Sequence, residues 1–272
     1  MVNILEKGKG CLIKEPSITD YRLEVMPVKA TVLPTSYSVE DKLSSQKDQG
    51  ASSSCVGQGF AYYLEVLNKI ETGNNVELSA RDNYSKIFLS GGGAYLVDAC
   101  KKIKNQGCVI EKDATSYENG AEPSEKFMRT RDDITSSEQD NGMTFLAKSY
   151  FTMSSTVANI KRAIYEGNGC CVACTGDNAG WQTADIQLPK SNDWGHCVFL
   201  TGYDDTTKKF KFKNSWGKEW GDNGSGYLPY EYVEKGFVSN AYVLVDASNS
   251  YYTSLLSIIE NLKNKIKELS KI

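Results

Sequence analysis

A loop leading into an amphipathic helix spans residues 49–70, and the helical pattern begins directly after a cysteine. Apolar residues separated by three or four positions define one helix face: Val56, Phe60, Tyr63, Leu67 and Ile70. Ser53 and Ser54 precede this pattern and can cap the helix, and Gly73 follows it as a stop signal. The stretch therefore predicts a helix whose first turn carries Cys55.

A thiol in the first turn of a helix lies among unpaired N–H groups at the positive end of the helix dipole, and both favour the thiolate. Cys55 is on that ground a candidate nucleophile. The alternative is a small, buried, apolar side chain, which is the commoner role of a cysteine. The chain contains a single histidine, His196, so a Cys–His catalytic pair has only one possible base.

Composition is that of an ordinary globular protein, with 272 residues, 40% hydrophobic content and 24% charged residues. A net charge of −3 gives no electrostatic reason to expect nucleic acid or an anionic membrane as a partner. No apolar run reaches the ~18 residues of a membrane span, and the first residues lack the pattern of a secretory signal. We therefore expect a cytoplasmic or assembly-associated protein rather than a secreted one.

Eight cysteines fit either a disulfide set in an oxidising compartment or free thiols in a reducing one. The missing signal pattern favours free thiols. Cys171 and Cys174 have the spacing of a metal or redox motif, but they lie in a predicted strand, where residues three apart point to opposite faces. We predict no metal and no cofactor.

The order of the helical and strand patterns predicts an α+β fold. Helical patterns recur along the first half of the chain, whereas residues 111–150 are mostly polar loop. From Cys170 onward strand patterns dominate. Helices first and strands afterwards suggest two lobes, with a cleft between them to which both lobes contribute residues.

A hairpin is predicted where residues 196–203 and 209–214 flank the turn-forming sequence Asp-Asp-Thr-Thr. If the strands pair symmetrically about Asp205, His196 and Asn214 lie opposite one another. Asn214 shares its strand face with two phenylalanines, so its amide points toward the core, where it needs polar partners.

Residues 78–93 can start a second helix at Ser79 and end in three consecutive glycines, Gly91 to Gly93. Glycine allows one stretch of backbone to run close to another. These glycines fit either a flexible turn or an open edge along which an extended peptide can pair.

Three features of the sequence resemble those of the papain-like cysteine peptidases, in particular of divergent members of bacterial or phage type. They are the spacing of six between Gln49 and Cys55, a Gly-His pair that opens a strand at 195–196, and the run Asn-Ser-Trp-Gly at 214–217 followed by Trp-Gly. The resemblance covers about 34–245. It implies a papain-like two-lobe α+β fold, in which a helical lobe with the nucleophile helix packs against an antiparallel sheet or barrel lobe across an active-site cleft.

By position, the resemblance implies a thiol-dependent endopeptidase. Cys55 is then the nucleophile and His196 the base and acid, while Asn214 orients the imidazole and Trp216 shields that contact. The side-chain amide of Gln49 donates to the oxyanion together with the backbone N–H of Cys55.

The resemblance also implies substrate contacts. Gly92 and Gly93 match the backbone segment that pairs with the substrate, and Cys197 matches the pocket for the second residue on the acyl side. Trp216 belongs to the same binding surface.

The chain departs from the family pattern in two places. The usual run Cys-Gly-Ser-Cys-Trp is Ser-Ser-Ser-Cys-Val at 52–56, so the disulfide partner before the nucleophile is absent, which again favours reduced thiols. The long inhibitory propeptide of many secreted members does not fit into residues 1–33, so we expect no latency by that route.

The C-terminal residues show a heptad pattern with apolar positions at steps of three and four: Tyr252, Leu255, Ile259, Leu262, Ile266 and Leu269. The pattern fits a helix packed on the peptidase lobe, or a short coiled coil that joins the chain to itself or to a larger assembly through residues 252–269.

We accordingly divide the chain into an N-terminal extension (1–33), a peptidase domain (34–246) and a C-terminal helix (247–272). The expected partner is a peptide or protein substrate. The alternative function is a non-catalytic or transacylating module of the same fold, tethered to an assembly through its C-terminal helix.

Overall fold

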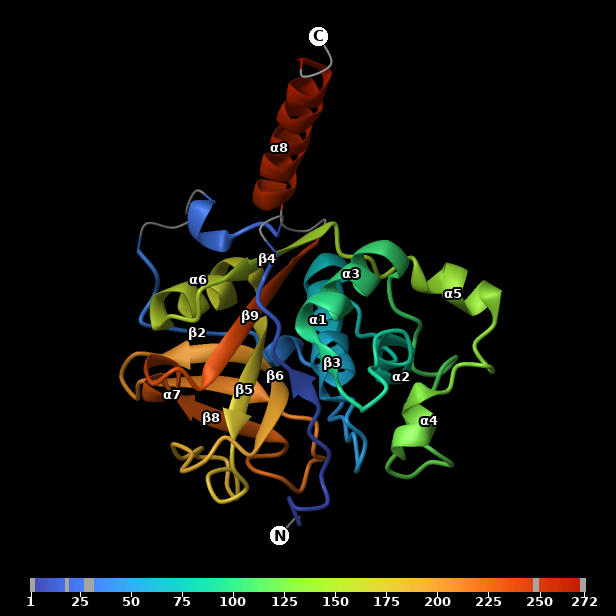
Figure 1. Ribbon diagram of the computed structural model, residues 1–272, viewed down its shortest axis with the longest axis vertical. Helices are drawn as coiled ribbons and strands as arrows, with labels where there is room; N and C mark the ends of the chain where they lie inside the picture. Colours follow the sequence, from blue (N-terminus) through green and yellow to red (C-terminus); the bar gives the residue numbers. More distant parts are fainter. Residues whose placement is uncertain (1–2, 18–19, 27–31, 247–249, 270–272) are drawn as a thin grey trace.

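The computed structural model describes residues 3–17, 20–26, 32–246 and 250–269, with side chains in the last range from 256 onward. A sheet lobe and a helical lobe lie side by side, and the long helix α1 (Cys55–Thr72) runs along their boundary (Figure 1). One hydrophobic cluster includes residues from both lobes. The predicted two-lobe α+β fold is confirmed.

The sheet lobe is built on a seven-stranded sheet with the order β4-β9-β5-β6-β7-β8, and β2 pairs with β6 beside this path. All of its strand pairs are antiparallel. The strands are β2 (Ser36–Ser38), β4 (Ser149–Met153), β5 (Cys170–Gly176), β6 (Trp194–Asp204), β7 (Lys209–Lys213), β8 (Ser225–Pro229) and β9 (Val238–Val245). β6 is the strand that enters the cleft.

The described helices beside α1 are α2 (Ala80–Tyr84), α3 (Leu96–Gln106), α4 (Glu125–Arg129), α5 (Ser136–Gly142), α6 (Val157–Gly167), α7 (Tyr230–Glu234) and α8 (Ser250–Leu269), with 3-10 turns η1 (Leu23–Val25) and η2 (Glu40–Lys42). The loop expected over 111–150 was wrong in part, because α4 and α5 lie inside it. Ser124 and Thr135 cap these two short helices through their side chains.

Helix α1 ends as predicted, because Gly73 has φ 74° and its N–H donates to the carbonyl of Lys69 at 3.0 Å. Its start differs from the prediction. Ser54 is the N-cap residue, but its side chain makes no cap bond and lies 2.7 Å from the hydroxyl of Ser52 instead. The first-turn N–H groups therefore remain available to other acceptors.

The 196–214 hairpin forms, but with a different register from the symmetric one. Near the turn, Tyr203 pairs with Phe210. In the part of the ladder farther from the turn, a β-bulge between Leu200 and Gly202 shifts the pairing by one residue. His196 lies beyond the last paired residues of this ladder, so a side-chain contact and not a strand pair joins it to Asn214.

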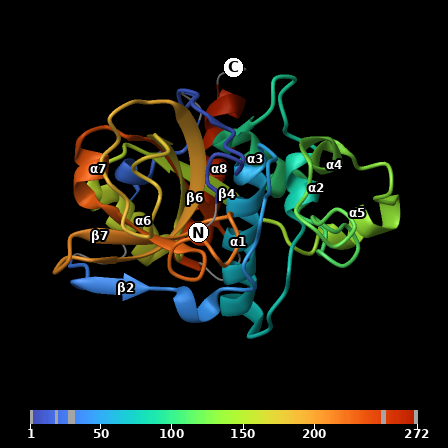
Figure 2. The same cartoon turned by 90° about the horizontal axis from the view of Figure 1, so that it is seen from below.

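The N-terminal residues run between the two lobes. Strand β1 (Cys11–Leu12) pairs in parallel with β3 (Ala94–Tyr95) from the helical lobe. Two perpendicular views place the N-terminal ribbon between β6 and α1 (Figures 1 and 2). The cleft is therefore filled by the chain itself.

Helix α8 projects from the body at the far end of the molecule (Figure 1). Leu256 is buried, whereas Leu262, Ile266 and Leu269 are 54%, 66% and 69% exposed. The first two seam positions, Tyr252 and Leu255, fall outside the described side chains. Among the described helices, none has the length and apolar character needed to cross a bilayer.

Candidate active site

Cys55 is fully buried at the first turn of α1, where the sequence predicts it. Burial raises the pKa of its thiol well above the usual value, and the neighbouring thiol of Cys197 acts in the same sense. Backbone N–H groups of Cys197, Gly10 and Val56 donate toward the sulfur and oppose that rise. The sulfur thus faces both the start of its own helix and the residue that follows His196.

His196 and Asn214 are in direct contact. The Nε2 atom of His196 lies 2.8 Å from the Oδ1 atom of Asn214, and both side chains are fully buried. The backbone N–H of Ser215 donates to the same Oδ1 at 2.8 Å, which holds the amide in place. The Nδ1 atom of His196 has no hydrogen-bond partner in the described part of the chain. It is the ring nitrogen left free for chemistry.

The ring of Trp216 covers this contact, with its centroid 4.7 Å from that of His196. A second indole, Trp181, meets the imidazole edge-on at 5.8 Å. The sequence analysis did not identify Trp181, because it lies in an irregular loop with no motif around it. Together the two indoles keep water away from the histidine.

Burial lowers the pKa of His196 to about 3, and the positive charge of Lys9 acts in the same direction. The hydrogen bond to Asn214 opposes this shift. Both pKa shifts favour the neutral forms of the imidazole and of the Cys55 thiol over a thiolate–imidazolium pair.

Gln49 is buried and held at both ends of its amide. Its Oε1 accepts a hydrogen bond from the hydroxyl of Ser215 at 2.5 Å, so its Nε2 must point the other way, where it donates to the carbonyls of Ser52 (2.7 Å) and Gly8 (3.0 Å). An amide fixed in this manner is a preorganised donor.

Residues 7–12, the cleft segment, occupy the position beside Cys55. The carbonyl of Gly8 accepts from Gln49 and also from Nε1 of Trp216 at 3.2 Å. The N–H of Gly8 donates to the carbonyl of Gly50 at 2.8 Å. Both polar groups of Gly8 are therefore paired with residues of the site.

Gly92 and Gly93 adopt positive φ angles of 93° and 77°. A Cβ on Gly93 would lie 2.3 Å from the carbonyl oxygen of Gly10, so only glycine fits there. The carbonyl of Gly10 accepts from the N–H of Ala94 at 2.8 Å. Of the two interpretations of these glycines, the structure has an extended segment paired along this edge, and the segment is the chain's own.

Cys197 follows His196 on β6 and is buried between the lobes. A Cβ on Gly59 of α1 would lie 3.0 Å from its sulfur and 3.6 Å from that of Cys171. Helix α1 therefore approaches β6 closely only because it carries glycine here.

A buried cation anchors the start of the cleft segment. The Nζ of Lys7, a residue only 7% exposed, lies 2.8 Å from a carboxylate oxygen of Asp48 and 2.7 Å from one of Glu122. Asp48 immediately precedes Gln49, so the anchor and the oxyanion donor belong to one loop.

Two residues that the sequence analysis missed shape the helical side of the cleft. One carboxylate oxygen of Glu125 accepts from the backbone N–H of Ser53 at 2.5 Å, and the other accepts from the hydroxyl of Tyr84 at 2.7 Å. The hydroxyl of Tyr84 in turn accepts from the N–H of Gly93 at 2.8 Å. Glu125 lies in a charged run with no motif, and only the fold brings it to Ser53.

All eight cysteines are buried and unpaired in the structure. Within the described residues, no three His, Cys, Asp or Glu side chains gather into a group that could hold a metal ion.

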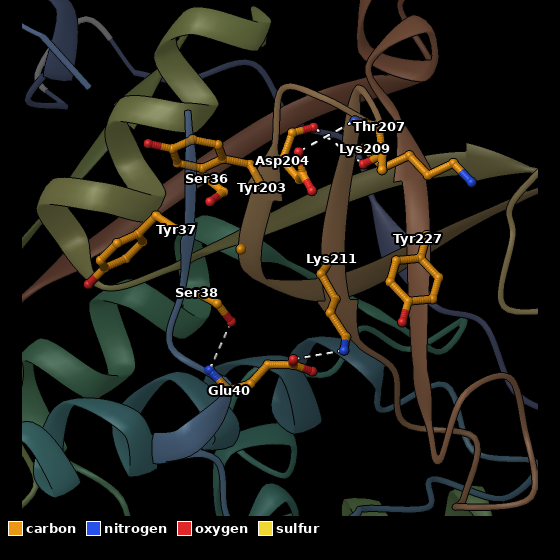
Figure 3. Close-up of a pocket in the computed structure, with 11 residues that line it drawn as sticks. Ser36, Tyr37, Ser38, Glu40, Tyr203, Asp204, Thr207, Lys209, Lys211 and Tyr227 are labelled. Atoms are coloured by element: carbon orange, nitrogen blue, oxygen red, sulfur yellow. Dashed lines mark hydrogen bonds and ion pairs between the residues drawn. The ribbon is translucent and has the colours of Figure 1, made fainter. Parts of the chain in front are cut away.

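A separate hollow of about 510 Å³ lies against β2, β6, β7 and β8, away from Cys55 (Figure 3). Its lysines are already engaged, Lys211 with Glu40 at 2.7 Å and Lys209 with Asp185 at 2.6 Å. It contains none of the residues described above, so it is not the catalytic site.

Known structures share this architecture. Xylellain, a cysteine protease from Xylella fastidiosa, matches with a TM-score of 0.75 and 20% identity, over 89% of this chain and 97% of that chain. The procathepsin B S9 of Trypanosoma congolense matches with a TM-score of 0.69 and 16% identity, over 89% and 87%.

Curated relatives match over shorter stretches. An uncharacterised peptidase C1-like protein of Acanthamoeba polyphaga mimivirus is 33% identical over 72 residues, which are 25% of this chain and 23% of that protein. Gamete and mating-type specific protein A of Dictyostelium discoideum is 44% identical over 57 residues, 21% of this chain and 11% of its own length. These sources are diverse, so a bacterial or phage origin stays a prediction.

The family model described as papain family cysteine protease matches residues 33–243, most of the chain. It includes the cysteine at the start of α1, the histidine on β6 and the asparagine that follows β7. The chain belongs to the papain family of cysteine proteases.

Proposed function

We propose that the protein hydrolyses peptide bonds as a thiol-dependent endopeptidase through Cys55 and His196. The observation that carries the proposal is the orientation of the imidazole. Asn214 binds Nε2 at 2.8 Å and leaves Nδ1 free, on a strand whose next backbone N–H points to the sulfur of Cys55. An oriented base on the strand that also contacts the thiol is the arrangement that supports nucleophilic catalysis.

In the proposed reaction, His196 takes the thiol proton and the sulfur of Cys55 attacks the substrate carbonyl carbon. The tetrahedral intermediate collapses as the imidazolium gives its proton to the leaving amine, which leaves a thioester on Cys55. His196 then takes a proton from water, the resulting oxygen attacks the thioester, and the acid product leaves as the thiol is restored.

The negative oxygen of each intermediate needs fixed donors. The side-chain amide of Gln49, held from behind by Ser215, is proposed as one donor and the backbone N–H of Cys55 as the other. Asn214 keeps the imidazole in plane, and Trp216 shields that bond from water. Gly92, Gly93 and Cys197 are proposed as the substrate-binding surface.

The cleft segment supports the further proposal that the described form is latent. It pairs with the donor Gln49 and with the edge at Gly93, where a substrate backbone would bind. From the length of residues 1–33 we expected no latency, but blocking this site takes only six residues. Besides burial, the charge of Lys9 in the segment lowers the pKa of His196, which disfavours the reactive ion pair.

The test combines selective alkylation with peptide hydrolysis, on the full chain and on Lys7→Glu, which should release the segment. Cys55 should react with iodoacetamide far faster than the other seven cysteines in Lys7→Glu, and adding His196→Ala should abolish this selectivity. Hydrolysis of a mixed peptide library should follow a bell-shaped pH profile. Equal labelling of all eight cysteines, or selectivity without His196, contradicts the proposal.

The transacylating alternative uses the same residues with an amine in place of water. Adding a free amine nucleophile during library digestion separates the two, because transfer gives a ligated peptide and hydrolysis gives a free carboxylate.

For α8 we propose self-association, supported by the exposure of Leu262, Ile266 and Leu269. Isoleucine at one seam position and leucine at the other are the residues that parallel two-stranded coiled coils prefer. Sedimentation velocity over a range of concentrations tests this, and a monomer at every concentration contradicts it.

A further inference from the structure

We propose that the groove beside Cys55 is selective for glycine, both in the chain's own cleft segment and in the peptides it cleaves. The inference rests on the proposed function and deepens it, because it names a substrate class: extended peptides with glycine at two alternate positions, Gly-Xaa-Gly. Ser52 and Ser53 form the wall that imposes this requirement.

The clearance along this wall is too small for a side chain. A Cβ on Gly8 would lie 1.7 Å from the carbonyl oxygen of Ser52, and a Cβ on Gly10 would lie 2.3 Å from that of Ser53. Both distances are far below any real contact of a Cβ atom. An alanine at either position requires one of the two backbones to move.

The wall is anchored and does not yield easily. The N–H and the hydroxyl of Ser52 both donate to the carbonyl of Gln49, at 3.1 and 2.6 Å. The N–H of Ser53 donates to Glu125 at 2.5 Å. A shift of either residue breaks these bonds within a buried loop, where an unpaired donor is costly.

The opposite side of the groove is also fixed. The carbonyl of Gly10 accepts from Ala94 at 2.8 Å and would touch any Cβ on Gly93. The backbone in the groove therefore cannot retreat from Ser53 without losing its pairing. Because the requirement comes from the clearance between two anchored stretches, it applies to any extended peptide between them.

Ser53 makes this groove narrower than the family pattern implies. The usual Cys-Gly-Ser-Cys run has glycine where this chain has Ser53. The Cβ of Ser53 lies 2.5 Å from the position of a Cβ on Gly10. Ser53 is thus a specificity-determining residue that adds a side chain to a wall already closed by backbone.

The residue between the two glycines, Lys9, is half-buried, and its Nζ donates to the carbonyl of Ile4. The Nζ of Lys9 lies 5.4 Å from the ring centroid of Trp216 and 5.8 Å from that of Trp194. Two indoles suit a cationic side chain. The preferred peptide accordingly has a basic residue between its glycines.

The first experiment measures binding without catalysis. Full-length Lys7→Glu protein is alkylated at Cys55 with and without a synthetic peptide of residues 5–12 carrying Cys11→Ser. We expect this peptide to protect Cys55, and the same peptide with Gly8→Ala or Gly10→Ala to bind at least about tenfold more weakly, the cost of overfilling a rigid site. A peptide with Lys9→Ala is the matched control, and its affinity should fall only a few fold. Alanine peptides that protect within twofold of the glycine peptide overturn the proposal.

The second experiment measures cleavage of a peptide library with glycine, alanine or serine at each position. Dominance of glycine at two alternate positions supports the proposal. Cleavage without preference for glycine overturns it and leaves the peptidase function intact. Protection of Cys55 that depends on glycine, without any cleavage, supports the glycine requirement and contradicts the peptidase function.

Ser53→Gly tests the wall itself. It should improve binding of the Gly10→Ala peptide only in part, because it removes the Cβ of Ser53 but leaves the carbonyl oxygen 2.3 Å from a Cβ on Gly10. It should leave the Gly8→Ala peptide unchanged, since that residue meets only backbone. Unchanged affinity for the glycine peptide shows that the variant folds. No gain for the Gly10→Ala peptide overturns the role assigned to Ser53.

Discussion

The two ends of the chain contrast sharply in how they are held. At the N-terminal end Ile4, Lys7 and Cys11 are 1%, 7% and 3% exposed, although this segment has no regular hydrophobic pattern. At the other end α8 has a clear heptad pattern, yet Ile266 and Leu269 are 66% and 69% exposed. A regular pattern predicts a helix, whereas burial depends on finding a partner.

The physical difference lies in the backbone. A helix satisfies its own N–H and C=O groups, so α8 needs a partner only for its apolar side chains. The cleft segment is nearly extended and must find its partners elsewhere, and Gly8 and Gly10 find them in Gly50, Gln49 and Ala94. Such backbone hydrogen bonds fix the position of a short segment more specifically than the apolar side chains of a helix do.

Reversing the charge of Lys7 should have the largest effect on this contrast. Lys7→Glu removes a buried cation and places a third carboxylate beside Asp48 and Glu122, a change worth about 3 kcal/mol. The expected result is a roughly 100-fold faster alkylation of Cys55.

Lys209→Glu, which breaks the exposed pair with Asp185, is the matched control and should leave the alkylation rate unchanged. Equal rates for both variants and the unmodified chain would mean that Lys7 does not hold the segment.

An intermediate effect is expected from removing one isoleucine side chain at each end. Ile4→Ala should lower the free energy of unfolding by about 2 kcal/mol, because it empties a buried site. Ile266→Ala should change it by less than about 0.5 kcal/mol at low protein concentration, because the side chain of Ile266 is 66% exposed. Urea unfolding curves measure both, and similar losses at the two ends would break the contrast.

A smaller effect should come from pH. With the segment bound, burial and the charge of Lys9 lower the pKa of His196 to about 3, and release should move that pKa back toward the ordinary value of ~6.5. Between pH 6.5 and 5.5 the released state binds a proton that the bound state does not, so acid favours release. The affinity of the 5–12 peptide for Lys7→Glu protein should fall about fivefold over this range.

Fluorescence anisotropy of the labelled peptide measures this affinity, with His196→Gln as the control that should lose the pH dependence. The range stops at pH 5.5, because burial raises the pKa of Asp48 and its protonation acts in the opposite sense. An affinity that stays constant or rises on acidification would contradict the account.

Local patterns predicted the parts of the fold that local physics determines. Gly73, the predicted stop signal, ends α1 with a positive φ, and α2 begins directly after Ser79, where a second helix is predicted to start. The contact of His196 with Asn214 was also expected, although the register that suggested it was wrong, because the turn spans four residues and Asp204 pairs with Lys209.

Contacts between distant segments were beyond the sequence analysis. The cleft segment pairs with residues from both lobes, and nothing in Lys-Gly-Lys-Gly indicates which carbonyls it will meet. Glu125 lies in a charged run that resembles solvated surface, and its partner Ser53 is 72 positions away. Helical periodicity carries no information on such pairs.

The carboxylate of Glu125 is hydrogen-bonded to both sides of the groove, to Ser53 directly and to Gly93 through the hydroxyl of Tyr84. A residue outside the catalytic pair therefore links the two sides of the groove. Replacing Glu125 by an acidic residue with a different side-chain length would change which peptides bind. It would leave Cys55 and His196 unchanged. Selectivity and reactivity can in this way diverge independently within a single scaffold.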